Sequence, residues 1–387
     1  QLLPQSGCDF KMARSQEVIE LIEKSVWDLG CEGLGFSDIY ESGLDKKKLP
    51  QLHSLYADIK PAGSKLKNNY HWANLKSSIQ EDLQTHIELE AELAKKYISY
   101  LAHFAKKHLL VEEIDSSSLK ADFNGYNFAT DLEWIPERAN LVNNKSPEAT
   151  TTPMRVVSHQ KDPVGNISFL LQESVEGFYY DNPPLTFLSE TGQHFQSSMK
   201  LKQRVVMTGF HKVIINSPFN LRVILIDPST LVGSETPTDK AMAAVSAVRS
   251  VITRPSKFEE LKTSVAFFPA VKQIYDDGSV GQVIGGYFYT SSGARYIHNS
   301  KGSGSDLRED PFQQGGELAS ATEPINFIKI DVEWAQEPGK PCVNLNGSAD
   351  MFARPETSLH SMEVGFSTAS GAVAAFLKKP LDYGKWK

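Results

Sequence analysis

The first part of the chain carries apolar residues at the spacing of a helix. Between Ser15 and Leu29 they recur every three or four positions, and Gly30 ends the run. A second run of the same kind covers residues 49–59 and ends before Pro61. Both segments are predicted to be amphipathic helices.

The strongest helical pattern runs from Asn74 to Val111. Apolar residues cover most of its circumference, and a helix with so little polar surface is normally buried in a bundle or at a subunit contact. At 1.5 Å per residue it would be roughly 50–55 Å long, which is longer than a compact domain usually needs. We therefore expect one long helix over 74–111, either at the centre of a bundle or between protomers. Its two apolar rows are Leu83, Ile87, Ala91, Ala94, Ile98, Leu101, Ala105 and Leu109, and Leu89, Leu93, Tyr97, Tyr100 and Phe104.

The composition changes near Ile135. Residues 136–163 contain four prolines among many Asn and Thr residues, which is typical of loops. This segment is predicted to be a linker between domains or an extended arm lying on a neighbouring subunit.

After residue 163, apolar residues begin to recur at every second position, as they do in strands. In the clearest strand, Ile328, Ile330 and Val332 alternate with Asp331 and Glu333. Short apolar runs at 213–215 and 221–226 are typical of buried strands, and the turns at 276–278 and 346–347 have the composition of hairpin turns.

Two capping boxes predict helices inside this region. Thr236 to Asp239 opens a helix over 237–252, and Ser256 to Glu259 opens a short one over 257–264. The fold class is therefore predicted to be α+β, with a helical N-terminal region followed by a β-rich C-terminal region with inserted helices. The expected division is a helical domain at 1–135, the linker or arm at 136–163 and a β-rich domain at 164–387.

Charge and composition exclude several classes of protein. The 387 residues include 40 Lys and Arg against 47 Asp and Glu, a net charge of −7, and no basic arm stands out. This disfavours sequence-specific nucleic-acid binding and a coat protein that condenses single-stranded RNA. No apolar run reaches the roughly eighteen residues of a membrane span. Three cysteines are too few for a disulfide framework, so we expect a cytoplasmic protein, or one in a virion if it is a coat subunit.

Searches for catalytic or metal-binding motifs assign no catalytic, cofactor-binding or metal residue. No phosphate-binding loop, esterase nucleophile elbow or zinc-binding spacing occurs. Asp82, His86 and Glu90 follow one another at intervals of four, so on a single helix they would share one face and could hold a metal ion. The same residues also suit a solvated acidic face, and no second Glu-x-x-His helix is present.

Two other groups could support hydrolysis. Asp331 and Glu333 share one face of a strand beside Trp334, as paired carboxylates do in glycosidases. Residues 298–306 contain all three residue types of a nucleophilic triad, although a polar loop collects the same types without catalysis. Those residues are His298, Ser300, Ser303, Ser305 and Asp306.

The sequence therefore favours a non-enzymatic structural protein that self-assembles. We expect a homo-oligomer joined through the 74–111 helix and the 136–163 arm, of the kind found in a viral capsid-type shell around double-stranded RNA. The alternative is a two-domain hydrolase of a sugar or ester that uses Asp331 and Glu333 or the 298–306 loop.

Overall fold

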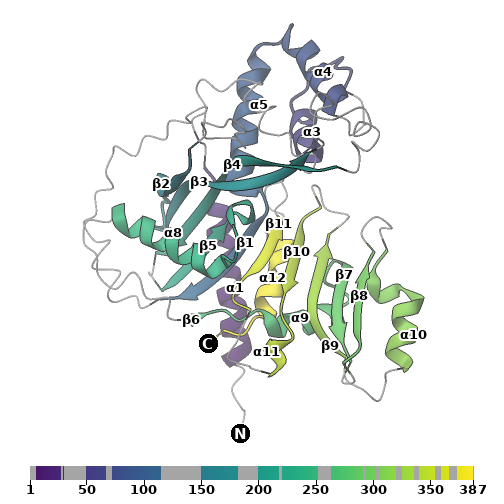
Figure 1. Ribbon diagram of the computed structural model, residues 1–387. Helices are drawn as coiled ribbons and strands as arrows, with labels where there is room; N and C mark the ends of the chain where they lie inside the picture. The colour runs from purple at the N-terminus through teal and green to yellow at the C-terminus, as the bar shows by residue number, and fades with distance from the viewer. Residues whose placement is uncertain are drawn as a thin grey trace.

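The structure is a computed structural model that describes most of the chain (Figure 1). The described residues are 6–27, 29, 49–66, 72–114, 150–181, 199–217, 220–251, 263–290, 293–300, 305–319, 325–334, 340–353, 359–365 and 373–386.

The described strands form one 11-stranded antiparallel sheet. Its order is β2-β3-β4-β5-β1-β11-β10-β9-β7-β8, and β6 adds to β1 beside this path. The strands are β1 Lys107–Glu113, β2 Thr152–Lys161, β3 Ile167–Asp181, β4 Leu201–Ile215, β5 Leu221–Ile226, β6 Thr263–Ser264, β7 Gln282–Tyr289, β8 Arg295–Asn299, β9 Asn326–Glu333, β10 Cys342–Asn346 and β11 Met362–Gly365.

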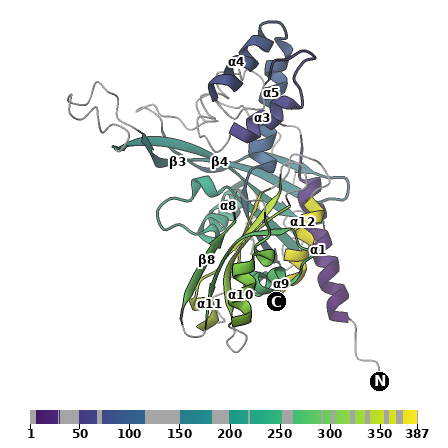
Figure 2. The same ribbon diagram turned by 90° about the vertical axis from the view of Figure 1, so that its right-hand side faces the viewer.

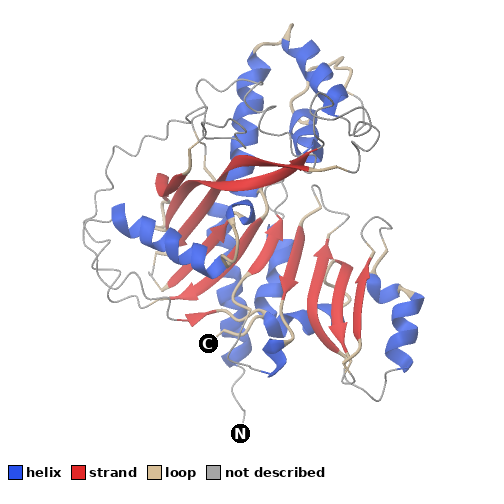
Figure 3. Cartoon of the chain, viewed as in Figure 1, coloured by secondary structure: helices blue, strands red, loops and turns tan. Residues whose placement is uncertain are grey.

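Helices lie on both faces of this sheet (Figure 3). The longer ones are α1 Ser6–Lys24, α3 Leu49–Ala57, α4 Trp72–Leu83, α5 Glu88–Ser99, α8 Pro237–Val251, α9 Phe268–Asp276, α10 Pro311–Ala319 and α12 Val373–Tyr383. The shorter ones are the π-helix η2 Tyr100–Phe104, the 3-10 helices η6 Pro228–Thr230 and η7 Leu307–Glu309, and α11 Asp350–Ala353.

Alternation along β4 separates the two faces. Ile214 joins a core with α1, α9 and α12, and Phe210 on the same face joins a second core with α3, α4 and α5. Val213 and Ile215 point the other way, into a third core against α8. We call these the α1 face and the α8 face. In Figure 1 the α8 face is turned towards the viewer, and the described helices leave its β11-β10-β9-β7-β8 part uncovered.

The α+β class is confirmed, with helices in the N-terminal region and a large antiparallel sheet downstream that carries inserted helices. The 237–252 helix is also found, as α8. Its predicted capping box is formed, because Asp239 N donates to Thr236 Oγ1 at 3.2 Å and Thr236 N donates to Asp239 Oδ2 at 3.0 Å. The predicted alternating strand is β9.

The prediction of one long helix over 74–111 is wrong. The segment contains most of α4, then a turn at 84–87, α5, η2 and finally the greater part of strand β1. Thr85 N and His86 N both donate to the carbonyl of Asp82, which ends α4. Residues 107–113 form a strand because they pair with β5 on one side and β11 on the other, and this tertiary pairing outweighs their helical spacing.

The apolar surface of α5 faces the chain's own core. Leu93, Tyr97 and Ile98 are buried in the cluster that α3 and α4 share with it. Most of the apolar residues that led us to expect an intersubunit contact at 74–111 are therefore buried within the chain, whereas Ile87 and Ala91 are exposed.

Other expectations are changed more locally. The arm predicted over 136–163 includes strand β2, while 136–149 lie outside the described residues. Of the predicted 257–264 helix, 257–262 lie outside the described residues, and Thr263–Ser264 form β6. The turn at 276–278 joins α9 to β7, and 346–347 lead from β10 towards α11, so neither closes a hairpin.

The predicted domain division stays a prediction, although β1 brings the N-terminal region into the centre of the sheet. Among the helices described, none combines the length and the apolar character needed to cross a bilayer.

Candidate functional site

The three residues considered for a metal site do not share a helix face. Asp82 lies in α4, His86 in the turn and Glu90 in α5. Asp82 Oδ2 accepts hydrogen bonds from Tyr56 and from Ser64, both at 2.5 Å, so this carboxylate ties α4 to α3 and the following turn. Within the described ranges, no group of three or more His, Cys, Asp or Glu side chains is placed to hold a metal ion.

The described residues of the 298–306 segment do not form a triad. The Ser300 hydroxyl donates to the carbonyls of Ile284 and Ser305, at 3.2 and 2.9 Å. His298 Nε2 lies 4.0 Å from Asp310, and Asp306 accepts from the Arg308 guanidinium. Ser303 lies outside the described residues.

Asp331 and Glu333 do lie on one face of β9, as predicted, and that face is the uncovered part of the α8 face. The register places Asp331 beside Asn344, Asn344 beside Glu363, and Glu363 beside His108. A polar row therefore crosses four adjacent strands, β9-β10-β11-β1. Trp334 packs instead towards Phe376 on the α1 face, with ring centres 5.7 Å apart.

Glu363 is the centre of this row. It accepts from Asn344 Nδ2 at 2.7 Å, pairs with Lys106, and lies 4.0 Å from His108 Nε2. Burial opposes its ionisation, but the hydrogen bond and charge of Lys106 outweigh burial, so the pKa of Glu363 falls below its ordinary value. Burial lowers the pKa of His108, against the charge of Glu363. The row thus holds a carboxylate and an imidazole side by side, each with its pKa below the ordinary value.

The two ends of the sheet differ in how they are protected. At one end, β2 contains Pro153, which has no N–H to donate, and its pairing with β3 is interrupted by two register shifts. Proline and bulges of this kind prevent further strand addition at an edge.

The other end, β8, has neither device. Its pairing with β7 is regular over five residues, and β7 is its one neighbour among the described strands. Ile297 is 80% exposed and Tyr296 43% exposed, and Leu318 on the adjacent helix α10 is 79% exposed (Figure 1). An exposed apolar edge without a proline or a bulge is a template for another strand.

The backbone of β8 can be assigned residue by residue. Thr290 N donates to Ala294 O, and Ser300 N donates to Ile284 O. Because hydrogen-bonding direction alternates along a strand, the even-numbered residues face β7. The backbone N–H and C=O groups of Arg295, Ile297 and Asn299 consequently point away from β7.

A second exposed apolar patch lies at the far end of the β3–β4 hairpin. Phe178 on β3 is 51% exposed, and Leu201 and Met199 are also exposed at the start of β4. The hairpin projects beyond the rest of the sheet (Figure 2). Lys202 Nζ lies 3.9 Å from the centre of the Phe178 ring, a cation–π contact.

Neither a scan against protein-family models nor a search of curated protein sequences finds a match to this chain. Sequence reasoning missed β8, although Arg295–Asn299 and Gln282–Tyr289 flank Gly293, and a glycine between two aromatic-containing runs is a hairpin signal.

Proposed function

We propose that this chain is a self-assembling structural protein whose subunits join through strand β8. The observation that carries the proposal is a contrast between the two edges of the described sheet. Strand β2 contains Pro153 and two register shifts, whereas β8 pairs regularly with β7 and has no second described strand beside it. When one edge strand carries features that prevent strand addition and the other carries exposed apolar side chains instead, the second edge is the one suited to pairing with another chain.

The proposed contact is an antiparallel β8–β8 pair around a two-fold axis. The backbone groups that point away from β7 belong to Arg295, Ile297 and Asn299. The symmetric register is therefore centred on Ile297, the middle of the three. It places Ile297 opposite its copy, Arg295 opposite Asn299, and Tyr296 opposite His298. No two basic side chains face each other, and the two sheets become one continuous sheet. A two-fold contact of this kind is the commonest in homo-oligomers.

Five paired residues bury less surface than the roughly 1,200 Å² of a typical stable interface. Helix α10 lies next to β8 (Figure 1) and contains the exposed Leu318, which we propose as an addition to the contact. The patch around Phe178 and Leu201 supplies a separate surface on the projecting hairpin. Two different contacts on one subunit allow dimers to join into a larger closed assembly, and the finer proposal is a capsid-type shell. The net charge of −7 favours a shell around double-stranded RNA over one that condenses single strands.

The test compares two isoleucines that are equally exposed. Ile297→Lys places two ammonium groups opposite each other in the β8–β8 pair, which is destabilising for directly opposed strands. Ile87→Lys changes a residue that is 78% exposed in the α4–α5 turn, away from both sheet edges.

Mass photometry and sedimentation of the full chain should show an oligomer for the wild type and for Ile87→Lys, and a smaller species for Ile297→Lys. Far-UV circular dichroism checks that each variant is folded. A monomeric wild type at micromolar concentration would overturn the assembly proposal, and an Ile297→Lys oligomer of unchanged mass would overturn the β8 contact.

The second candidate is a hydrolase that uses the polar row. The observation in its favour is that Asp331 shares one sheet face with Asn344, Glu363 and His108. Two strand spacings of about 4.8 Å separate the backbones of Asp331 and Glu363, compatible with a two-carboxylate site. If this candidate is right, chromogenic glycosides or esters are hydrolysed by the wild type, and Asp331→Asn and Glu363→Gln each abolish turnover. No turnover by the wild type on either substrate class would count against it.

A further inference from the structure

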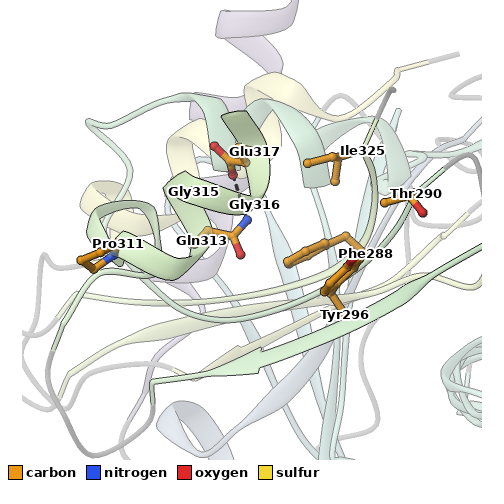
Figure 4. Close-up of a pocket in the computed structure, with 9 residues that line it drawn as sticks. All are labelled: Phe288, Thr290, Tyr296, Pro311, Gln313, Gly315, Gly316, Glu317 and Ile325. Carbon is orange, nitrogen blue, oxygen red and sulfur yellow. Dashed lines mark hydrogen bonds between the residues drawn. The ribbon is translucent and has the colours of Figure 1, made fainter. Parts of the chain in front are cut away.

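A cavity of about 370 Å³ lies on the α1 face, between helix α10 and strands β7 and β8 (Figure 4). This volume is within the range of small-molecule sites, roughly 300–1,000 Å³. The lining residues are Phe288, Thr290, Tyr296, Pro311, Gln313, Gly315, Gly316, Glu317 and Ile325.

One wall of the cavity is aromatic. Phe288 and Tyr296 are cross-strand neighbours with stacked rings, 5.7 Å between centres and 16° between planes. Phe327 packs behind Phe288 at 5.5 Å, and Tyr275 packs on Phe327 at 4.2 Å. Phe288, Phe327 and Tyr275 belong to the buried core, whereas Tyr296 on β8 is 43% exposed, so the wall joins a core-packed part to an exposed ring.

The opposite wall is formed by α10 and carries the polar groups. Figure 4 shows Gln313 and Glu317 across the cavity from Phe288 and Ile325. Gln313 Nε2 donates to Glu317 Oε1 at 2.8 Å, and the Tyr275 hydroxyl also donates to that oxygen. Burial, followed by the hydrogen bond to Glu317, raises the pKa of Tyr275, so its hydroxyl remains a donor. Two fixed donors therefore orient the carboxylate.

Glu317 is the one charged side chain among the nine lining residues, and none of the nine is basic. An anionic group next to aromatic faces attracts organic cations, because the carboxylate supplies charge and the ring faces supply the cation–π interaction. An anion would meet the like charge of Glu317, and none of the nine lining residues offers it a counter-charge.

We propose that this cavity binds a small organic cation with an apolar or aromatic body and an ammonium group. The body would lie against Phe288, Tyr296 and Ile325, and the ammonium would lie towards Glu317. This site is additional to the assembly proposed above and does not depend on it.

The test uses three probes of one shape and different charge: benzylammonium, benzyl alcohol and benzoate. Binding to the full chain is measured by isothermal titration calorimetry and by saturation-transfer NMR at neutral pH. We expect benzylammonium to bind about tenfold more tightly than benzyl alcohol, since cation–π and carboxylate contacts favour the charged form. Benzoate should bind more weakly than both.

Two variants separate the charge from the cavity. Glu317→Gln keeps the shape and an acceptor oxygen, and should remove the preference for the cation while benzyl alcohol still binds. Gly316→Leu should block all three probes. A Cβ added at Gly316 meets no atom within 4 Å, so the substitution starts from open space beside the cavity. Gln314→Leu, on the same helix with an exposed side chain outside the cavity lining, is the matched control and should bind like the wild type.

The titrations are repeated on Ile297→Lys, the variant designed to prevent the β8–β8 contact. Ligand binding is thereby measured independently of whether the chain assembles. Absence of benzylammonium binding by the wild type would overturn the proposal. Equal binding of benzoate, or cation binding unchanged in both Glu317→Gln and Gly316→Leu, would overturn it as well.

Discussion

Acid should destabilise this protein through one buried histidine. His103 lies in η2 and is almost fully buried, with Nε2 3.1 Å from the carbonyl oxygen of Trp27 and its ring edge-on to the Trp27 indole. Burial, reinforced by the charge of Lys212 on β4 and, to a lesser degree, of Lys107 on β1, lowers the pKa of His103 from 6.5 to about 2. The imidazole is therefore neutral in the folded protein at all ordinary pH values.

The direction of the effect follows from proton binding. Between pH 2 and pH 6.5 the unfolded chain binds a proton at this residue and the folded chain does not, so the free energy of unfolding falls as the pH falls through 6.5. With these two pKa values, lowering the pH from about 7 to about 5.5 costs about 1.3 kcal/mol, and each further unit towards pH 2 costs about 1.4 kcal/mol.

The assay is urea unfolding of the wild type and of His103→Gln at the two pH values. Glutamine retains a donor for the Trp27 carbonyl and cannot titrate. Other histidines are present in both proteins, so the difference between the two pH-dependent losses reports His103 alone. The wild type should lose about 1.3 kcal/mol more than the variant. Equal losses in the two proteins would refute the reasoning.

Two further substitutions test the packing of the sheet. Glu112→Gln should lower the free energy of unfolding by about 3–5 kcal/mol, because it removes the carboxylate that lies 2.7 Å from the buried guanidinium of Arg222. Chemical denaturation measures this, and a loss below about 1 kcal/mol would contradict it. Gly209→Ala should cost about 1–3 kcal/mol, because the added methyl would lie 2.2 Å from Thr230 Cγ2. Gly316→Ala is the control. Its methyl meets no atom within 4 Å and alanine favours a helix, so it should raise the melting temperature. Equal effects of the two glycine substitutions would contradict the close approach at Gly209.

The elements found correctly from the sequence are those specified by adjacent residues. The capping box at Thr236–Asp239 sets the start of α8, and alternation alone identifies β9. The prediction of a helix over residues 107–111 failed because a short apolar run is compatible with a helix and with a buried strand equally well. The partners that decide the matter, at 221–226 and 362–364, lie more than a hundred residues away in sequence.

The candidate surfaces were harder to predict for the same reason. Arg295–Asn299 is a candidate contact only because the topology places β8 at the end of the sheet. The order of strands in a sheet cannot be predicted from the residues of one strand. The cavity joins α10 to Phe288, Tyr296 and Ile325, which no single motif connects. Asp331 and Glu333 were placed correctly on one face, but their neighbours Glu363 and His108 come from distant strands.

The β8–β8 contact can be tested most directly by a disulfide at its centre. In the symmetric register the two copies of residue 297 form a hydrogen-bonded pair with Cα atoms about 5.5 Å apart, within the range that a disulfide spans. Under mild oxidation, Ile297→Cys should give a covalent dimer on a non-reducing gel, in higher yield than the wild type. Ile87→Cys, equally exposed, should not. A dimer yield no higher for Ile297→Cys than for Ile87→Cys would contradict the proposed assembly through β8.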